Sequence, residues 1–547
     1  MNSRWRWLVL VALAVLAFSA AALRLSSTRL FPRYDEVAYL SVARTFAREG
    51  GVASTIRCYV ETRCQEDNRP PLFMLLMQPF MDDAPSSLAK AKLVTHATAF
   101  LLMLVMFLIV RRRFSNTEAA ACVVALCLMP ELQDLASRVL HDPLYAATTF
   151  AAVFAIAAWQ NKGLVAWLAV GGLVGLAFLT KGSGHLLFIP LLATSLYCHR
   201  MALVRRPIVY ASVAGFVAVA FFLLWRNTKL WGSPFYTINA VQVWLDRWSD
   251  VWAWQLDPAR ESVGLIWYLR RHSILDLLAI LAKGAGLTAG TFFYVAGLGF
   301  ANPVARVVTG VAVWTLACLG LRRRWRSGHR VEVVAVMSTL GVYFAALALA
   351  QGGSLGPNAR YALPYVALVL PYASHEFFAG VWPHLCAWWV HWVPRVPPAT
   401  AAMTLASALL LARVVVAAPI FATNPLSYYA VEPHWHETSE WLSHALVPGE
   451  KFATSPQSFY STWDLPYPDT DARWLFKFGT PAPELLWYLD LAHVRKALVD
   501  RSLPEFKDYG DKLSAVVDAH GPLEFLHWPR CFADSATPSR FLLYCHP

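Results

Sequence analysis

Apolar runs long enough to cross a lipid bilayer recur from the first residues of the chain to about residue 420. A helix needs roughly 20 apolar residues to span a bilayer, and it satisfies its own backbone polar groups in hydrocarbon. Of the 547 residues, 57% are hydrophobic and only 15% are charged, which is more apolar surface than one water-soluble core can bury. The sequence therefore predicts an all-α polytopic membrane protein.

The formal net charge of +12 is concentrated in short arginine clusters beside apolar runs, at residues 111–113, 205–206 and 322–324. Basic residues at the ends of spans mark the cytoplasmic side, so these clusters indicate membrane topology and do not predict nucleic-acid binding. We expect about eleven spans in the plasma (inner) membrane. The first loop, residues 25–87, and the tail from residue 424 then lie outside the cytoplasm.

Two segments leave the topology open. Residues 7–23 follow Arg4 and Arg6 and end in small residues, so they resemble a signal peptide as much as a span. We favour an uncleaved anchor, and either outcome places the first loop outside. Residues 274–300 are apolar but interrupted by a lysine and glycines. A single crossing here would place the arginines at 322–324 outside, so we interpret this segment as re-entrant or interfacial.

The last part of the chain, residues 424–547, differs in composition from the module formed by residues 1–423. Proline, aromatic and charged residues are interspersed, and no apolar run is long enough to span a membrane. We expect a small α+β domain outside the cytoplasm. A helix is predicted near Trp441 and Leu442, and a short strand at residues 451–454.

Cysteine positions agree with this topology. Cys58 and Cys64 fall together in the first outer loop, and Cys531 and Cys545 fall together in the tail. Close pairs in an oxidising compartment can form disulfides, so each pair is a candidate disulfide. The other cysteines lie in or beside spans and are interpreted as packing residues; they are Cys122, Cys127, Cys198, Cys318 and Cys386.

The candidate for catalysis is a pair of adjacent carboxylates, Asp35 and Glu36, shortly after the first apolar run. A carboxylate near the membrane interface can act as a general base that takes a proton from an attacking hydroxyl. The alternative is structural, because Asp is a favoured N-cap and Glu suits the first turn of a helix. The two interpretations are compatible, since a helix N-terminus can hold an acid in a fixed orientation.

This loop resembles the Asp-Glu first-loop motif of the C superfamily of glycosyltransferases (GT-C). The resemblance is to the branch that contains the protein O-mannosyltransferases (dolichyl-phosphate-mannose-protein mannosyltransferases) and the bacterial lipid A aminoarabinose transferase. It covers roughly residues 1–380, and it implies a GT-C type bundle. Further segments resemble this branch in the same order, at residues 68–73 (Asn-Arg-Pro-Pro-Leu-Phe), 141–143 (His-Asp-Pro), 177–182 (Ala-Phe-Leu-Thr-Lys-Gly), 231–236 (Trp-Gly-Ser-Pro-Phe-Tyr) and 358–364 (Asn-Ala-Arg-Tyr-Ala-Leu-Pro).

The resemblance implies inverting transfer of a hexosyl or pentosyl unit from a polyprenyl-phosphate-linked donor to a hydroxyl of a lipid, glycan or protein. Asp35 is then the base, and Glu36 bonds the acceptor or orients the site. A single base that faces the sugar carbon opposite a leaving phosphate also favours inversion on physical grounds.

Lys181, Arg360 and, more weakly, Arg69 are candidates to bind the donor phosphate, because its charge develops as it leaves. The alternatives are interfacial snorkelling for Lys181 and Arg360 and a loop salt bridge for Arg69. His141, Asp142 and Tyr361 are candidates to line the acceptor or donor cleft. Asp142 could instead cap the helix in which Pro143 takes the first position.

No cofactor is expected to be required. Asp35, Glu36, His141 and Asp142 offer oxygen and imidazole ligands for a divalent cation, but the branch in question does not require one for transfer, so a metal is not favoured. A polytopic transporter or lipid flippase is the alternative function. It predicts charges buried at mid-span and two related halves, and neither is evident. A non-catalytic scaffold would leave Asp35 and Arg360 free to vary.

Overall fold

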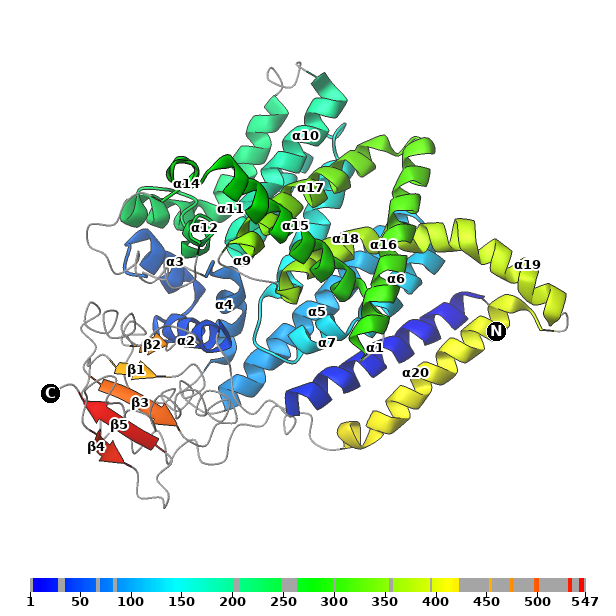
Figure 1. Ribbon diagram of the computed structural model, residues 1–547, viewed down its shortest axis with the longest axis horizontal. Coiled ribbons are helices and arrows are strands. Elements are labelled where there is room, and N and C mark those ends of the chain that lie inside the picture. Colours follow the sequence, from blue (N-terminus) through cyan, green and yellow to red (C-terminus); the bar gives the residue numbers. More distant parts are fainter. Residues whose placement is uncertain are drawn as a thin grey trace.

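The computed structural model describes residues 3–27, 35–64, 69–81, 86–200, 207–246, 263–298, 302–353, 358–393 and 396–422, together with five short strands between residues 452 and 545. The first nine ranges form a helical bundle (Figure 1). Within the described part, six helices are long and apolar enough to cross a membrane. They are α1 (Ser3–Ser27), α5 (Ser86–Arg113), α11 (Pro207–Trp231), α15 (Ile274–Ala296), α16 (Pro303–Arg326) and α17 (Arg330–Gly352).

A seventh candidate span is bent in the middle. α6 (Asn116–Leu128) and α7 (Pro130–Ala136) meet at 67° and together pass the same test of length and composition. The bend falls at Pro130, which lacks a backbone N–H and clashes with the preceding turn of a helix. The prediction of an integral membrane helical bundle is confirmed, whereas the number of about eleven spans stays a prediction.

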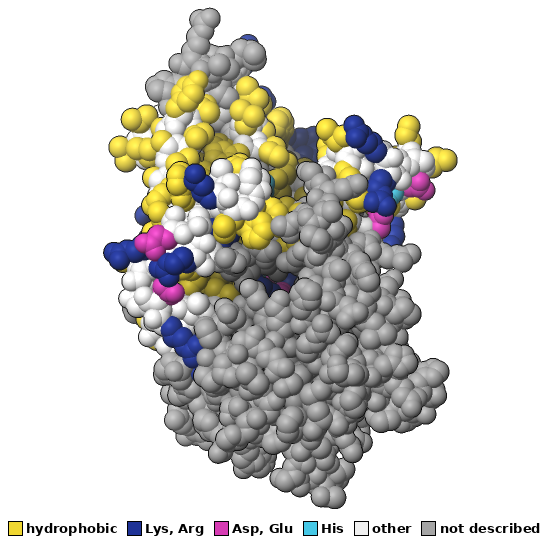
Figure 2. Space-filling model, turned by 90° about the vertical axis from the view of Figure 1, so that its left-hand side faces the viewer, with side chains coloured by type: hydrophobic (Ala, Val, Ile, Leu, Met, Phe, Trp, Pro, Cys, Tyr) yellow, Lys and Arg dark blue, Asp and Glu magenta, His cyan; other side chains and the backbone are white. Residues whose placement is uncertain are grey.

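Further helices complete the bundle. They are α8 (Asp142–Ala158), α9 (Leu164–Thr180), α10 (Phe188–His199), α18 (Leu363–Glu376), α19 (Trp382–Trp392) and α20 (Pro398–Ala422). Figure 1 shows α20 lying along α1, and the two helices are in contact. Large hydrophobic side chains remain exposed on many helices of the bundle, which suits a lipid environment. On the face shown in Figure 2, yellow hydrophobic side chains gather at the upper left.

Helix α15 packs against both α16 and α17. Those two helices are joined by a short turn at residues 327–329, directly after the arginine cluster. The first half of α15 contacts the end of α17, where Lys283 Nζ donates to the carbonyl oxygen of Gly352 over 3.2 Å. The segment that ends α15 contacts the start of α16, where the backbone N–H of Leu298 donates to Thr309 Oγ1 over 3.3 Å.

Both ends of α15 therefore lie on the side of the bundle away from the arginine-rich turn. The contact with α17 is close, because a Cβ atom on Gly284 would lie 1.7 Å from the carbonyl oxygen of Ala348. This arrangement is the one expected of a re-entrant or interfacial segment. Whether α15 crosses the membrane stays a prediction.

Short helices at this same end of the bundle come from the loops. The first loop forms α2 (Asp35–Arg48), α3 (Val52–Val60), α4 (Leu72–Met77) and η1 (Gln78–Phe80). Later loops form η2 (Gly182–Leu187), α12 (Ile238–Gln242), α14 (Leu265–Arg271) and η4 (Ala359–Ala362). η4 follows the end of α17 and contacts both α15 and α7.

The tail contributes five strands in one sheet, in the order β2-β1-β3-β5-β4. β1 (Phe452–Thr454) pairs in parallel with β2 (Arg473–Leu475) and β3 (Lys496–Asp500). β5 (Phe541–Cys545) pairs antiparallel with β3 and with β4 (Arg530–Ala533). The predicted strand at residues 451–454 is confirmed by β1.

Other predictions for the tail remain open. The helix predicted near Trp441 and Leu442 lies outside the described residues. Cys531 and Cys545 lie on the neighbouring strands β4 and β5, in which Arg530 is paired with Tyr544. The disulfide between these cysteines and the extracytoplasmic position of the domain stay predictions.

Candidate active site

The predicted site residues come from five separate segments and meet where these segments begin or end. Asp35 is the first residue of α2, and Asp142 is the first residue of α8. Lys181 follows the last residue of α9, Arg360 lies in η4, and Arg69 precedes α4. Side chains at helix ends are not needed for the packing of the bundle, so they are free to gather in one polar cluster.

The Asp35 carboxylate lies between two guanidinium groups. Arg360 Nη2 is 2.5 Å from Asp35 Oδ2, and Arg69 Nη2 is 3.1 Å from Asp35 Oδ1. Burial alone would raise the pKa of Asp35, but the charges of Arg360 and Arg69 outweigh that effect and hold this pKa well below its usual range. Asp35 is therefore ionised at neutral pH.

A second ion pair lies beside the first. Lys181 Nζ is 3.3 Å from Asp142 Oδ1, and it also lies over the ring of Tyr361, 4.0 Å from its centroid. The Asp142 side chain is only 1% exposed, and its other oxygen, Oδ2, is buried without a hydrogen-bond partner. Burial lowers the pKa of Lys181 to about 8, although Asp142 opposes the shift.

Aromatic side chains connect the two ion pairs. Arg360 Nη2 donates to the hydroxyl oxygen of Tyr361 over 3.1 Å, so Tyr361 contacts both Arg360 and Lys181. The hydroxyl of Tyr39 is hydrogen-bonded to Nδ1 of His141, and His141 Nε2 is buried without a partner. The cluster thus holds three cations against two carboxylates, which gives it a net attraction for an anion.

The structure decides between several alternatives that the sequence left open. Arg69 does form the loop salt bridge considered for it, and its partner is Asp35. Snorkelling is wrong for Lys181 and Arg360, because each side chain is only 18% exposed and pairs with a carboxylate. The N-cap interpretation of Asp142 is also wrong, since His141 takes the cap position and Asp142 is already helical.

Glu36 has different partners from Asp35. It is buried, and its Oε1 lies 3.9 Å from Nε of Arg138, which also pairs with Asp134 Oδ2 at 3.2 Å. Sequence reasoning missed Arg138, and no motif marks it. It also missed Tyr39, although Tyr39 follows Asp35 by four residues and so falls on the same face of a helix.

The turn that carries Lys181 is held by a buried tyrosine network that sequence reasoning also missed. The Tyr145 hydroxyl donates to the Tyr343 hydroxyl over 2.9 Å and lies 3.2 Å from Ser183 Oγ. The Tyr343 hydroxyl in turn donates to the carbonyl oxygen of Ser183 over 2.8 Å. Because Ser183 is two residues after Lys181, these bonds fix the position of the Lys181 side chain in the cluster.

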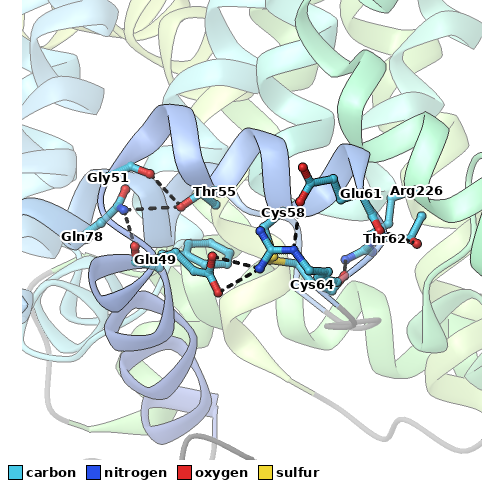
Figure 3. The surroundings of a disulfide bond; sticks show 11 residues. Glu49, Gly51, Thr55, Cys58, Glu61, Thr62, Cys64, Gln78 and Arg226 are labelled. Carbon is cyan, nitrogen blue, oxygen red and sulfur yellow. Dashed lines mark hydrogen bonds and ion pairs between the residues drawn. A yellow bond between two sulfur atoms is a disulfide. The ribbon is translucent and has the colours of Figure 1, made fainter.

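Within the first loop, the predicted disulfide joins Cys58 and Cys64, whose Cα atoms are 5.5 Å apart (Figure 3). Arg226, near the end of α11, donates from Nη1 to the carbonyl oxygen of Cys64 over 3.3 Å and lies over the ring of Tyr59. Gln78 Nε2 donates to the carbonyl oxygen of Phe46, the third-last residue of α2, over 2.5 Å. These contacts anchor the helices of the loop and thereby position the start of α2.

A metal site was considered at Asp35, Glu36, His141 and Asp142. Within the described ranges, no group of three or more His, Cys, Asp or Glu residues is arranged to hold a metal ion. Asp35, Glu36 and Asp142 lie near Arg or Lys side chains instead. Independence from metal ions stays a prediction.

Known proteins and structures resemble this chain in parts of the sequence and in fold. The family model of dolichyl-phosphate-mannose-protein mannosyltransferase matches residues 68–225. No curated protein sequence matches the chain significantly. Among solved structures, ArnT from Cupriavidus metallidurans bound to undecaprenyl phosphate has a TM-score of 0.51 at 13% identity, over 100% of this chain and 98% of ArnT.

A second similar structure is the archaeal oligosaccharyltransferase AglB from Archaeoglobus fulgidus, in complex with an inhibitory peptide and a dolichol-phosphate. Its TM-score is 0.53 at 13% identity, over 99% of this chain and 74% of AglB. The fold is therefore that of the GT-C class of membrane proteins. The family model that matches residues 68–225 is that of a protein O-mannosyltransferase, which is one member of the predicted branch, and ArnT is similar to this chain in fold.

Proposed function

We propose that the protein moves a sugar from a polyprenyl-phosphate-linked donor to an acceptor hydroxyl on the extracytoplasmic side, with inversion and with Asp35 as the general base. The observation that carries this proposal is the Asp35 cluster, in which an ionised carboxylate lies between Arg69 and Arg360, close to the Lys181 pair. The comparisons support the reaction class, because ArnT was solved with undecaprenyl phosphate and AglB with a dolichol-phosphate.

In the proposed step, Asp35 takes the proton of the acceptor hydroxyl while the hydroxyl oxygen bonds to the anomeric carbon of the sugar. The bond from that carbon to the phosphate oxygen breaks, and its electron pair leaves with the phosphate. Attack and departure occur on opposite faces, so the configuration inverts. Polyprenyl phosphate and the glycosylated acceptor are the products.

The two arginines have a double role in this proposal. With two guanidinium partners, Asp35 is a weak base, because its pKa is held low. A donor phosphate competes with the carboxylate for Arg69 and Arg360, since both oxyanions accept paired hydrogen bonds from a guanidinium. As the arginines turn to the phosphate, Asp35 becomes more basic, and the same cations stabilise the charge of the leaving group.

Lys181 supplies a third positive charge. Its Nζ lies 4.0 Å from the ring centroid of Tyr361, and the hydroxyl of the same tyrosine accepts a hydrogen bond from Arg360. Lys181 and Arg360 therefore lie beside the same side chain. Glu36 is assigned to the acceptor, because it lies next to Asp35 at the start of α2. A transporter or flippase stays the alternative, but the charged cluster lies at helix ends and not at mid-span.

The proposal is tested by incubating the purified protein with a panel of lipid-linked sugars and acceptors. We expect polyprenyl phosphate to be released in step with a glycosylated product of opposite anomeric configuration, measured by NMR. Retention of configuration would contradict a single displacement with one base. Movement of intact donor between leaflets of a proteoliposome, with no release of polyprenyl phosphate from any donor, would instead favour the flippase.

A further inference from the structure

Arg306 is a buried arginine near the start of α16, outside the Asp35 cluster. It is 8% exposed, and its guanidinium lies over the ring of Tyr294 on α15, with Cζ 3.7 Å from the ring centroid. One nitrogen, Nη1, donates to the Tyr294 hydroxyl oxygen over 2.7 Å. The other two nitrogens, Nε and Nη2, are buried and have no hydrogen-bond partner. One whole edge of the guanidinium is thus unbonded.

The unbonded edge has a definite chemical preference. The N–H groups on Nε and Nη2 are parallel and coplanar, and they match two oxygen atoms of a phosphate or carboxylate. Buried donors without partners are unfavourable, so an oxyanion that bonds to both would be held strongly. The stack on Tyr294 fixes the plane of the guanidinium and so prepares the edge for such a ligand.

Two simpler explanations of Arg306 do not fit. An arginine near the end of a span usually extends its charge to the lipid headgroups, but this side chain is buried and stacked on a neighbouring helix. A structural ion pair would need a carboxylate. Glu131 on α7 lies within electrostatic reach of Arg306 and Arg138, but Nε and Nη2 of Arg306 have no hydrogen-bond partner.

The surroundings of Arg306 indicate the class of ligand. On the neighbouring turns of α16, Val304, Val307 and Val308 are 70%, 38% and 62% exposed. This exposed apolar surface suits hydrocarbon, whereas the unbonded edge of Arg306 suits an anion. A molecule that satisfies both has an apolar body and a charged head, as a membrane phospholipid or a polyprenyl phosphate has.

We propose that Arg306 forms a second anion-binding subsite, which takes the phosphate group of a membrane lipid through Nε and Nη2. The lipid is either the polyprenyl phosphate of the donor or an anionic phospholipid. Assignment to the donor rests on the proposed function, whereas the subsite itself does not.

The test measures binding and needs no turnover. Unmodified protein, Arg306→Gln and Arg306→Lys are purified in detergent, and thermal stability is followed during titration with undecaprenyl phosphate, phosphatidylglycerol or inorganic phosphate. Arg322→Gln is the matched control, because Arg322 is an exposed arginine at the other end of the same helix. A ligand that binds the folded state raises the melting temperature by mass action, so each titration gives an affinity.

We expect Arg306→Gln to weaken binding of one lipid phosphate by about 10-fold or more, as loss of charge-assisted hydrogen bonds predicts, with the control unchanged. Arg306→Lys keeps the charge but loses the paired donors, so a smaller loss is expected. A loss of affinity for undecaprenyl phosphate identifies the donor lipid as the occupant of the subsite. A loss of affinity for phosphatidylglycerol alone identifies a phospholipid as the occupant.

The subsite would be overturned if each of the two lipids bound to the Arg306 variants with the same affinity as to the unmodified protein. If Arg306→Gln does not fold, Arg306→Lys decides the matter, and an unchanged affinity in that variant overturns it equally. If the unmodified protein binds no undecaprenyl phosphate, the proposed function fails, and the phosphatidylglycerol titration alone decides the subsite.

Discussion

At the scale of single residues, the candidate site is a balance between carboxylates and cations. Asp35 has two guanidinium partners, whereas Asp142 has one ammonium partner and one unbonded oxygen. The Asp35 carboxylate is therefore the more strongly stabilised of the two, and its basicity depends on whether Arg69 and Arg360 bind it or another anion. This dependence determines the acidic limb of the pH profile of the reaction, and Lys181 determines the alkaline limb.

The acidic limb is expected to respond to Arg360. The charge of Arg360 is the largest influence that lowers the pKa of Asp35, while burial acts in the opposite direction. Arg360→Gln therefore raises this pKa, and kcat/KM falls at a higher pH on the acidic side because the base must be deprotonated. We also expect roughly a 10-fold loss at neutral pH from the weaker hold on the phosphate.

The check on this prediction is a profile of kcat/KM from pH 8 down to the lowest pH at which each protein stays folded, for Arg360→Gln and the unmodified protein, with Arg112→Gln as control. Arg112 is exposed and far from the cluster in sequence. An acidic limb at the same pH in all three proteins would mean that Arg360 does not set the basicity of the catalytic carboxylate.

The alkaline limb is expected to report Lys181. Its pKa is lowered to about 8 by burial, so the free protein loses this positive charge as the pH rises through that value. kcat/KM for the donor should then fall above about pH 8. Arg stays charged throughout this range, so Lys181→Arg should move the limb to higher pH. Profiles between pH 7 and pH 10 test this, and an identical limb in Lys181→Arg and in the exposed control Lys162→Arg would exclude Lys181.

At the residue scale, the motifs marked segments that the structure brings together. Contacts join Asp35, Arg69, His141, Asp142, Lys181, Arg360 and Tyr361 in one cluster, whereas the roles predicted for them stay predictions. The sequence could not indicate that both arginines contact Asp35, because the start of α2, the residues before α4 and η4 are brought together only by tertiary packing. Tyr145 and Tyr343 were missed for the same reason, since they lie within apolar helices where an aromatic residue usually packs in the core.

At the scale of helices, α15 is the element that decides the topology. The arginine cluster at residues 322–324 led to the prediction that this segment does not cross, and the contacts of α15 with the far ends of α16 and α17 agree with it. Length and composition alone make α15 a candidate span. Tertiary contacts and apolar length thus give different answers for the same helix.

Labelling of single cysteines in intact cells distinguishes these answers. In a background without the exposed Cys318, we introduce Ser273→Cys, Asn302→Cys or Ser327→Cys, which lie before α15, before α16 and in the arginine-rich turn. A membrane-impermeant maleimide should label the first two positions from outside and reach Ser327→Cys only after permeabilisation. Labelling of Ser273→Cys without labelling of Asn302→Cys would show that α15 crosses.

At the scale of the whole molecule, the sequence predicted the class of fold because hydrocarbon permits few solutions. Apolar length, basic clusters and a few ordered motifs were enough to predict a GT-C type bundle, and the likeness to ArnT and AglB confirms it. The tail is harder to predict, because short strands carry little periodic signal and their partners are distant in sequence. β1, for example, pairs with β3, which lies more than forty residues later.

The central claim is that Asp35 is the base of a transfer from a lipid-linked sugar. The most direct test follows release of polyprenyl phosphate by the unmodified protein, by Asp35→Asn, and by Glu61→Gln as a control, because Glu61 is a half-exposed carboxylate in the same loop. Asn keeps the size of Asp but cannot accept a proton, so we predict a loss of about 100- to 10,000-fold with donor binding retained and the control unaffected. Full activity in a folded Asp35→Asn variant would contradict the account.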